Sequence, residues 1–143
     1  MARNKGLVVV AQVAVRWADM DMMGHVNNVL YIRYMEQGRL GWFNAANMPV
    51  ATDADGPVVA SNHCNYRKPI EQMTTVDVKV WCDRAGRSSF RMRYEITDAL
   101  RPGEFYADGE TMLVWVERKT GRPAPVPDAL RALISSEEPE SGR

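Results

Sequence analysis

The segment from about residue 29 to residue 46 constrains the fold most, because it is free of proline and apolar almost all the way round a helical wheel. At about 100° per residue, only Arg33, Gln37 and Asn44 form a narrow polar edge. Two asparagines, which are favoured N-cap residues, precede the segment. Since a helix with so little polar surface must be buried, we expect a long central helix that packs in a core on one side and against another subunit on a second side.

Gly38 and Gly41 lie inside this predicted helix. In a helix interior a glycine costs up to about 1 kcal/mol relative to alanine, because it loses more backbone freedom on folding. Close packing of another element against the helix backbone explains such residues, and we expect it at both positions.

Sequence patterns typical of β-strands surround the predicted helix. A first strand is predicted over residues 7–17, and four more over residues 58–66, 76–83, 89–96 and 106–118, where β-branched residues cluster or apolar and polar residues alternate. Short turns separate the later strands, and a short helix is predicted at about 128–134. This order favours an α+β domain in which one antiparallel sheet of about five strands curls around the central helix.

Length and charge restrict the class of protein. The 143 residues suffice for one domain with its own core, so we expect a single domain over residues 1–135 and a flexible acidic tail at 136–143. Eighteen Lys and Arg balance eighteen Asp and Glu, which gives no reason to expect nucleic acid or a membrane as partner. No run approaches the ~20 apolar residues of a membrane span. Cys64 and Cys82 form no metal-binding or disulfide motif, and we expect reduced thiols in a cytoplasmic protein.

The most informative motif lies immediately before the predicted helix and reads ADMDMMGHVNN, from Ala18 to Asn28. It places Asp19, Asp21 and His25 beside a helix N-terminus, where free backbone N–H groups form a preorganised site for negative charge. Hydrolysis of a thioester develops an oxyanion on the carbonyl oxygen. A carboxylate base or nucleophile beside a helix start is therefore suited to this reaction.

The run D-x-D-x-x-G-H-V-N-N-x-x-Y-x-x-Y-x-E, from Asp19 to Glu36, resembles the sequence signature of the 4-hydroxybenzoyl-CoA thioesterase family of hotdog-fold acyl-CoA thioesterases. The similarity covers about residues 7–127 and includes YRKP at 66–69, GRSS at 86–89 and LVWV at 113–116. The resemblance implies a hotdog fold and hydrolysis of an acyl-CoA to a free acid and CoA. It also implies no metal or cofactor, and a homodimer or homotetramer.

By position, the resemblance assigns the catalytic carboxylate to Asp21, which would act as nucleophile or as general base for water. The oxyanion donor would be a backbone N–H near Asn28, aided by the helix dipole. Gly24 and His25 complete the predicted catalytic residues. The predicted substrate-binding residues are Asn27, Tyr31, Glu36, Arg67, Arg87, Ser88 and Ser89.

Simpler structural roles compete with several of these assignments. We expect Asp19 to hold the loop through hydrogen bonds to backbone N–H groups. Three roles are open for His25: a proton shuttle, a contact to the thioester, or a hydrogen bond within the loop. Glu36 is expected to pair with Arg39 or Arg33 at helical spacing, with the acyl pocket as the alternative. The candidates for binding CoA phosphates are Arg67, Lys68, Arg84, Arg87, Ser88 and Ser89, although basic residues in turns are usually only solvated.

Three other functions are open at this point. A hotdog-fold dehydratase or hydratase would need an acid–base pair directed at the α and β carbons of the acyl group. A non-catalytic module would bind acyl-CoA without turnover. A metal-dependent hydrolase using Asp19, Asp21 and His25 would need further ligands, and the remaining histidine is His63. The position of Asp21 directly before the helix favours the thioesterase, while the acyl group and the thiol carrier, CoA or acyl carrier protein, are not distinguished.

Overall fold

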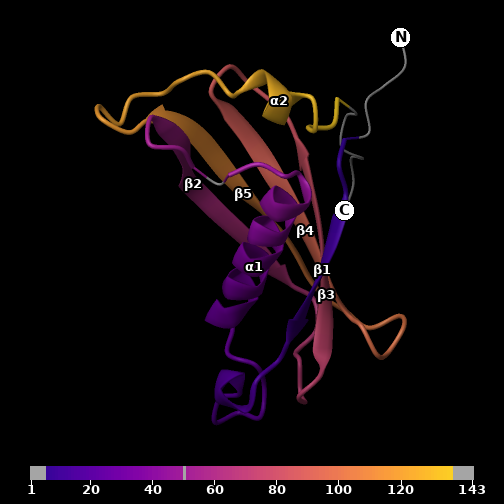
Figure 1. The fold of residues 1–143 in the computed structure, drawn as a ribbon. Coiled ribbons are helices and arrows are strands. Elements are labelled where there is room, and N and C mark those ends of the chain that lie inside the picture. Colours follow the sequence, from indigo (N-terminus) through magenta and orange to yellow (C-terminus); the bar gives the residue numbers. More distant parts are fainter. Residues whose placement is uncertain (1–5, 50, 137–143) are drawn as a thin grey trace.

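The computed structural model describes residues 6–49 and 51–136. One antiparallel sheet of five strands forms the frame of this part of the chain (Figure 1). In the spatial order β1-β3-β4-β5-β2, the strands are β1 (Val9–Ala14), β3 (Thr75–Asp83), β4 (Ser89–Asp98), β5 (Phe105–Glu117) and β2 (Asp55–Tyr66). The predicted α+β class with about five antiparallel strands is confirmed.

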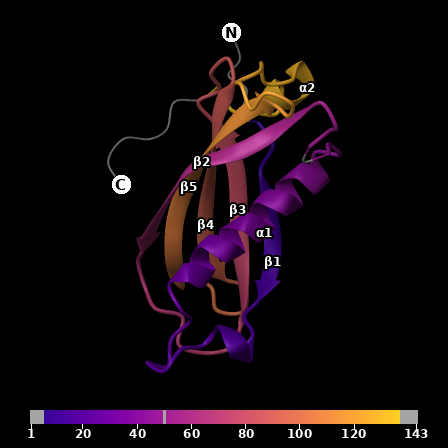
Figure 2. The same cartoon turned by 90° about the vertical axis from the view of Figure 1, so that its left-hand side faces the viewer.

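One long helix, α1 (Val29–Ala45), lies diagonally across one face of the sheet (Figure 2). The helix residues that are buried are Tyr31, Tyr34, Met35, Gly38, Trp42 and Phe43. Alternate residues of the three central strands are buried with them, including Val76, Val78, Val80, Phe90, Met92 and Leu113. Because each buried apolar side chain of this size contributes about 1.5–3 kcal/mol, this shared core fixes the position of the helix on the sheet.

The two glycines of α1 pack differently. A Cβ added at Gly38 would lie 2.6 Å from Val78 Cγ1 and 2.9 Å from Val80 Cγ2, so the expected close packing is confirmed there. At Gly41 the contact is looser, with Ala11 Cβ at 3.2 Å. Gly38 is therefore the point at which the helix backbone rests directly on β3.

The first two strands begin or end at residues other than those predicted. β1 ends at Ala14, and Trp17–Asp19 forms a short 3-10 helix, η1. The turn forms because the Asp19 carboxylate accepts a hydrogen bond from the backbone N–H of Arg16 at 3.0 Å. β2 starts at Asp55 because its pairing with β5 already begins there, opposite Glu117.

The C-terminal helix α2 (Asp128–Arg131) is also shorter than predicted. It ends because the residues that follow bond to the edge of the sheet, where Leu133 O accepts from the N–H of Leu7 and the N–H of Ser135 donates to Cys82 O. The predicted acidic tail at 136–143 lies outside the described residues beyond Ser136. None of the helices in the described residues is long and apolar enough to cross a membrane.

The alternating direction of the elements divides the molecule into two ends. The start of α1, the residues after β2 and the start of β3 meet at the lower end in Figure 1, where the N–H of Val26 donates to Ile70 O and the N–H of Val15 donates to Thr74 O. The turn between β3 and β4 lies with α2 at the upper end. Any site at the N-terminus of α1 is therefore built from the loops of the lower end.

Candidate active site

A pocket of about 310 Å³ opens at the N-terminal end of α1. One wall is the loop between η1 and α1, and the other is the segment that follows β2. The lining residues are Asp21, Met23, His25, Val26, Asn28, Tyr31, Tyr66, Arg67, Lys68 and Pro69. Five of the predicted site residues, Asp21, His25, Asn28, Tyr31 and Arg67, therefore share one pocket.

Asp21 is an exposed carboxylate held by its own loop. Its Oδ1 accepts a hydrogen bond from the backbone N–H of Met23 at 2.8 Å and a longer one from His25 at 3.5 Å. Its Oδ2 accepts no hydrogen bond from the part of the chain that the structure describes. One carboxylate oxygen therefore orients the side chain, and the other is available to a water molecule or to substrate.

A small hairpin presents Asp21 to the pocket. The N–H of Asp21 donates to His25 O at 2.8 Å, and the N–H of Gly24 donates to Asp21 O at 3.1 Å. Gly24 has a φ of +78° and no atom near its Cβ position, so the left-handed turn rather than lack of space requires glycine here. Gly24 thus shapes the loop. The Nε2 atom of His25 lies 3.9 Å from Oε1 of Glu71.

The start of α1 leaves one backbone donor free at the pocket. Asn27 caps the helix, because its Oδ1 accepts from the N–H of Val29 at 3.1 Å. Asn28 already has helical dihedral angles, and its side chain makes no capping bond, so the expected capping role falls to Asn27 alone. The N–H of Asn28 has no acceptor among the described residues. It therefore meets the requirement for the predicted oxyanion donor.

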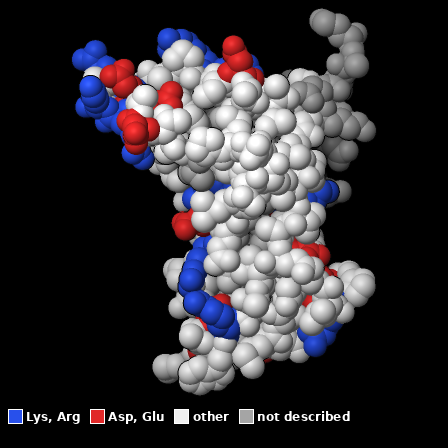
Figure 3. Space-filling view, in the orientation of Figure 1, with Lys and Arg blue, Asp and Glu red and all other residues white. Residues whose placement is uncertain are grey.

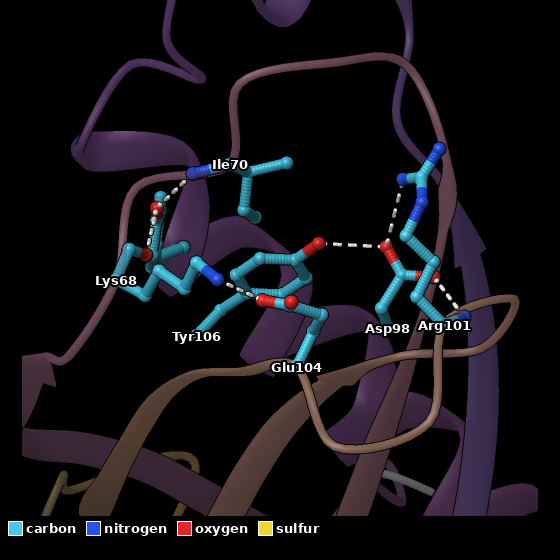
Figure 4. A network of polar contacts seen from close by, with 7 residues as sticks. Lys68, Ile70, Asp98, Arg101, Glu104 and Tyr106 are labelled. Carbon is cyan, nitrogen blue, oxygen red and sulfur yellow. Dashed lines mark hydrogen bonds and ion pairs between the residues drawn. The ribbon is translucent and has the colours of Figure 1, made fainter.

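The second wall carries two cations that are paired with carboxylates. Arg67 Nε lies 2.9 Å from Asp108 Oδ2, and Lys68 Nζ contacts Glu104 (Figure 4). Burial alone would raise the pKa of Asp108, but hydrogen bonds from Arg67 and Asn65 outweigh burial and hold the pKa below its usual range. Arg67 and Lys68 remain about half exposed, with 44% and 52% of their side chains accessible, so each can also meet an anionic ligand.

Asp19 lies behind the pocket and is 1% exposed. It accepts hydrogen bonds from the Arg16 backbone N–H and guanidinium and from the Tyr34 hydroxyl, the last at 2.7 Å. Burial acts to raise the pKa of Asp19, yet these bonds and the Arg16 charge outweigh it and lower the pKa. The predicted structural role of Asp19 is confirmed.

Two groups of predicted binding residues lie outside the pocket. Glu36 is 59% exposed and pairs with Arg39 at 3.9 Å, which is the structural alternative that the helical spacing predicts. The other group is Arg87 and Ser88, which lie in the turn before β4, and Ser89, which is the first residue of β4. Backbone bonds tie this turn to β5 and to the segment before α2, at the opposite end of the sheet. The structure does not bring these residues to the pocket of the same chain.

Four residues that line the pocket, Met23, Val26, Tyr66 and Pro69, were not among the predicted site residues. Tyr66, Lys68 and Pro69 belong to the YRKP run, which was already part of the family resemblance and could have identified the whole wall. The Tyr66 hydroxyl donates to Asn28 O at 3.1 Å and so joins this wall to the helix start. Such a contact across 38 positions leaves no local pattern in the sequence.

Within residues 6–49 and 51–136, no group of three or more His, Cys, Asp or Glu side chains is arranged to hold a metal ion. The Asp19 carboxylate already accepts hydrogen bonds from Arg16 and Tyr34. His63 lies on β2 and contacts Asn65 Oδ1 at 3.0 Å.

Known proteins share both the sequence pattern and the fold. A sequence model of the thioesterase-like superfamily matches residues 15–134. The uncharacterized protein YsmA of Bacillus subtilis (strain 168) is 31% identical over 111 residues, which is 78% of this chain and 74% of that protein. The PA2801 protein of Pseudomonas aeruginosa is 39% identical, with a TM-score of 0.80 over 86% of this chain and 95% of that one. A DHNA-CoA thioesterase from Staphylococcus aureus is 25% identical, with a TM-score of 0.78 over 87% of each chain.

Proposed function

The chain belongs to the thioesterase-like superfamily, and from this membership and the geometry of the pocket we propose that it hydrolyses an acyl-CoA thioester with Asp21 as the catalytic carboxylate. The hotdog fold predicted from the sequence is confirmed by the similarity to solved structures of this superfamily. One observation carries the proposal for the site. Asp21, with one free carboxylate oxygen, and Asn28, with a free backbone N–H, line the same pocket at the start of a long helix.

Two chemical routes fit this arrangement. In the general-base route, Asp21 takes a proton from a water molecule whose oxygen attacks the carbonyl carbon, the C–S bond breaks and the CoA thiolate leaves. In the nucleophilic route, a carboxylate oxygen of Asp21 attacks the carbonyl carbon, the thiolate leaves, and water cleaves the resulting mixed anhydride. Both routes place negative charge on the carbonyl oxygen, which the N–H of Asn28 and the positive end of the α1 dipole would stabilise.

The charges at the pocket support CoA as the thiol carrier. Arg67 and Lys68 lie on the wall opposite Asp21 and are exposed enough to reach a phosphate. Their carboxylate partners Asp108 and Glu104 hold them in place in the absence of ligand. The guanidinium of Arg67 uses Nε for Asp108, which leaves its remaining N–H donors for phosphate oxygens. The Staphylococcus aureus relative, named as acting on DHNA-CoA, provides a further reason to test aromatic acyl groups.

The proposed assay follows thiol release from a panel of acyl-CoAs that includes straight chains of several lengths and aromatic acyl groups. Asp21→Asn is the informative variant, because an asparagine keeps an oxygen for the Met23 N–H and so preserves the loop. We expect it to lower kcat roughly 10²-fold or more on any substrate of the wild type. Asp53→Asn is the matched control, since Asp53 is exposed and lies in the loop before β2 at the other end of the molecule.

The outcomes separate the candidate functions. A wild-type enzyme inactive on the whole panel would refute thioester hydrolysis and favour the acyl-CoA binding module. An Asp21→Asn variant as fast as wild type and Asp53→Asn would leave the reaction standing and refute the role of Asp21.

We also propose that two copies of the chain associate through the edge of β2. Residues 58–63 of this strand are exposed on both faces, with Val58 at 47% and Val59 at 46%. An uncovered edge of this kind offers unpaired backbone groups to another chain. The face that carries α1 is largely uncharged at its centre (Figure 3), and the helix exposes Val29 and Leu40. These features support the oligomer expected from the apolar helix.

A further inference from the structure

Helix α1 bonds to each wall of the pocket through the hydroxyl group of one of its own tyrosines, and these two tyrosines lie three positions apart. We propose that Tyr34 and Tyr31 are positioning residues, Tyr34 for the loop that carries Asp21 and Tyr31 for the opposite wall. The kinetic part of this proposal rests on the proposed function, whereas the structural part does not.

Tyr34 holds the Asp21 loop through Asp19. Its hydroxyl donates to Asp19 Oδ2 at 2.7 Å, and both side chains are almost completely buried. The backbone oxygen of Asp19 accepts from the N–H of Asn27 at 2.9 Å, so Asp19 closes the base of the loop in which Asp21 lies. Burial and the adjacent carboxylate of Asp19 raise the pKa of Tyr34, which keeps the hydroxyl a proton donor. The position of Asp21 therefore depends on this bond.

Tyr31 holds the opposite wall. Its hydroxyl accepts from the backbone N–H of Ile70 at 3.2 Å and donates to Lys68 O at 3.3 Å. One hydroxyl thus joins the residues on both sides of Pro69, a residue that lines the pocket. The Tyr31 ring also packs edge-on against Tyr66, with 5.0 Å between ring centroids.

This segment has no partner strand at the point where it crosses the end of the helix. The backbone N–H groups of Arg67 and Lys68 both donate to Tyr106 O, at 2.9 and 3.1 Å, where the pairing of β2 with β5 ends. Beyond Pro69, the Ile70 oxygen accepts from the N–H of Val26 at 2.8 Å. Between these points the Tyr31 hydroxyl takes the place of a ladder partner. Without it, the backbone of residues 67–70 would be bonded, among the described residues, only to Tyr106 and Val26, and the wall would otherwise depend on the side-chain contacts of Tyr66, Arg67 and Lys68.

Both walls of the pocket are therefore held by side chains of the same helix, α1. Positions three apart on an α-helix differ by about 4.5 Å along its axis and lie on neighbouring sides of it, so Tyr31 and Tyr34 can point to different loops from one turn. A tyrosine places its hydroxyl with only two rotatable bonds. Catalytic groups must be held within about 0.5 Å of the productive geometry, and an error of 1 Å can cost about 10²-fold in rate.

The experiment compares Tyr34→Phe and Tyr31→Phe, each of which keeps the ring and removes only the hydroxyl. Tyr94→Phe is the matched control, because the Tyr94 hydroxyl is also buried and donates to Thr111 Oγ1 at 3.0 Å, within the sheet and outside the pocket. We expect Tyr34→Phe to lower kcat about tenfold with KM changed less than about twofold, since the reacting carboxylate is displaced. We expect Tyr31→Phe to raise KM about tenfold with a smaller change in kcat, since the substrate-binding wall is loosened. Tyr94→Phe should leave both constants unchanged.

Hydrogen exchange measured by mass spectrometry gives a second readout that needs no substrate. Tyr34→Phe should speed exchange in residues 19–27 and leave residues 67–70 as in the wild type, and Tyr31→Phe should do the reverse. Exchange in both segments equal to that of Tyr94→Phe would overturn the proposal, whatever the activity. Altered exchange without the kcat and KM split would refute the kinetic part. If the wild type hydrolyses no thioester, the proposed function fails while exchange still decides whether these residues position the walls.

Discussion

Adding one methyl group at Gly38 tests how closely α1 is seated on the sheet that positions the pocket. The new Cβ would lie 2.6 Å from Val78 Cγ1 and 2.9 Å from Val80 Cγ2, closer than van der Waals contact allows. Valine side chains in a central strand have little rotamer freedom, so the helix itself must move. We expect this overpacking to lower the free energy of unfolding by about 2–3 kcal/mol, the upper part of the usual range. Replacing glycine by alanine in a helix recovers about 1 kcal/mol, which leaves a net loss of about 1–2 kcal/mol.

Gly41→Ala is the matched control for this prediction. It gains the same helix propensity of about 1 kcal/mol. Its Cβ would meet Ala11 Cβ at 3.2 Å, a contact that a shift of a few tenths of an ångström relieves. We expect its free energy of unfolding to stay unchanged or to rise by up to about 1 kcal/mol. The difference of about 2 kcal/mol between the two variants then measures the packing at Gly38.

Urea unfolding followed by circular dichroism, with thermal melting beside it, measures both values. Protomer concentration must be equal in all samples, because an associating protein gains stability with concentration. For a domain of this size 1 kcal/mol corresponds to about 3–4 °C, so Gly38→Ala should melt about 3–8 °C below wild type. A Gly38→Ala variant as stable as Gly41→Ala would refute the reasoning, because it would show that the helix does not rest on Val78 and Val80.

Two further predictions concern assembly and acid stability. Val59→Lys places a charge on the exposed edge of β2 in both copies. Sedimentation velocity at micromolar concentration should show a dimer for the wild type and a monomer for the variant. A monomeric wild type would contradict the proposed assembly. For Asp98, burial acts to raise the pKa, but hydrogen bonds from the Tyr106 hydroxyl and the N–H of Leu100 outweigh it, so the folded pKa is lowered. A lowered folded pKa gives stability that is present above the unfolded value of about 3.9 and is lost as pH falls through the folded pKa. Asp98→Asn should therefore melt lower than wild type at pH 7 with a smaller further loss between about pH 5 and 2, whereas parallel melting curves across that range would rule out the stabilising role.

The elements were predictable where one face of each must be buried. Alternation from Val76 to Cys82 and from Phe90 to Ile96 identified β3 and β4, and the lack of polar positions identified α1. The first strand was predicted too long because the run of β-branched and apolar residues continues through Val15, which is buried although it lies beyond the end of β1. The chain turns there because Asp19 bonds back to Arg16, and an Arg-x-x-Asp spacing is too common to predict a turn by itself.

The site was predictable where its residues lie close together in the chain, as in the Asp21 loop. The links that hold the walls, from Tyr34 to Asp19 and from Tyr31 to Ile70, join residues 15 and 39 positions apart and left no local signal. Family resemblance identified these tyrosines as part of a motif without the contacts that they make.

The separation of Arg87, Ser88 and Ser89 from the pocket of the same chain could have been predicted from the sequence. In a sheet of antiparallel strands joined by short turns, successive elements run in opposite directions. Since α1 starts at one end, β2 returns to that end and places Tyr66–Pro69 beside the helix start. β3 then leaves it, so the turn after β3 must lie at the far end, and the structure has it there beside α2. The composition of a turn indicates which ligands it could bind, whereas the direction of the strands before it decides whether it can reach the pocket of the same chain.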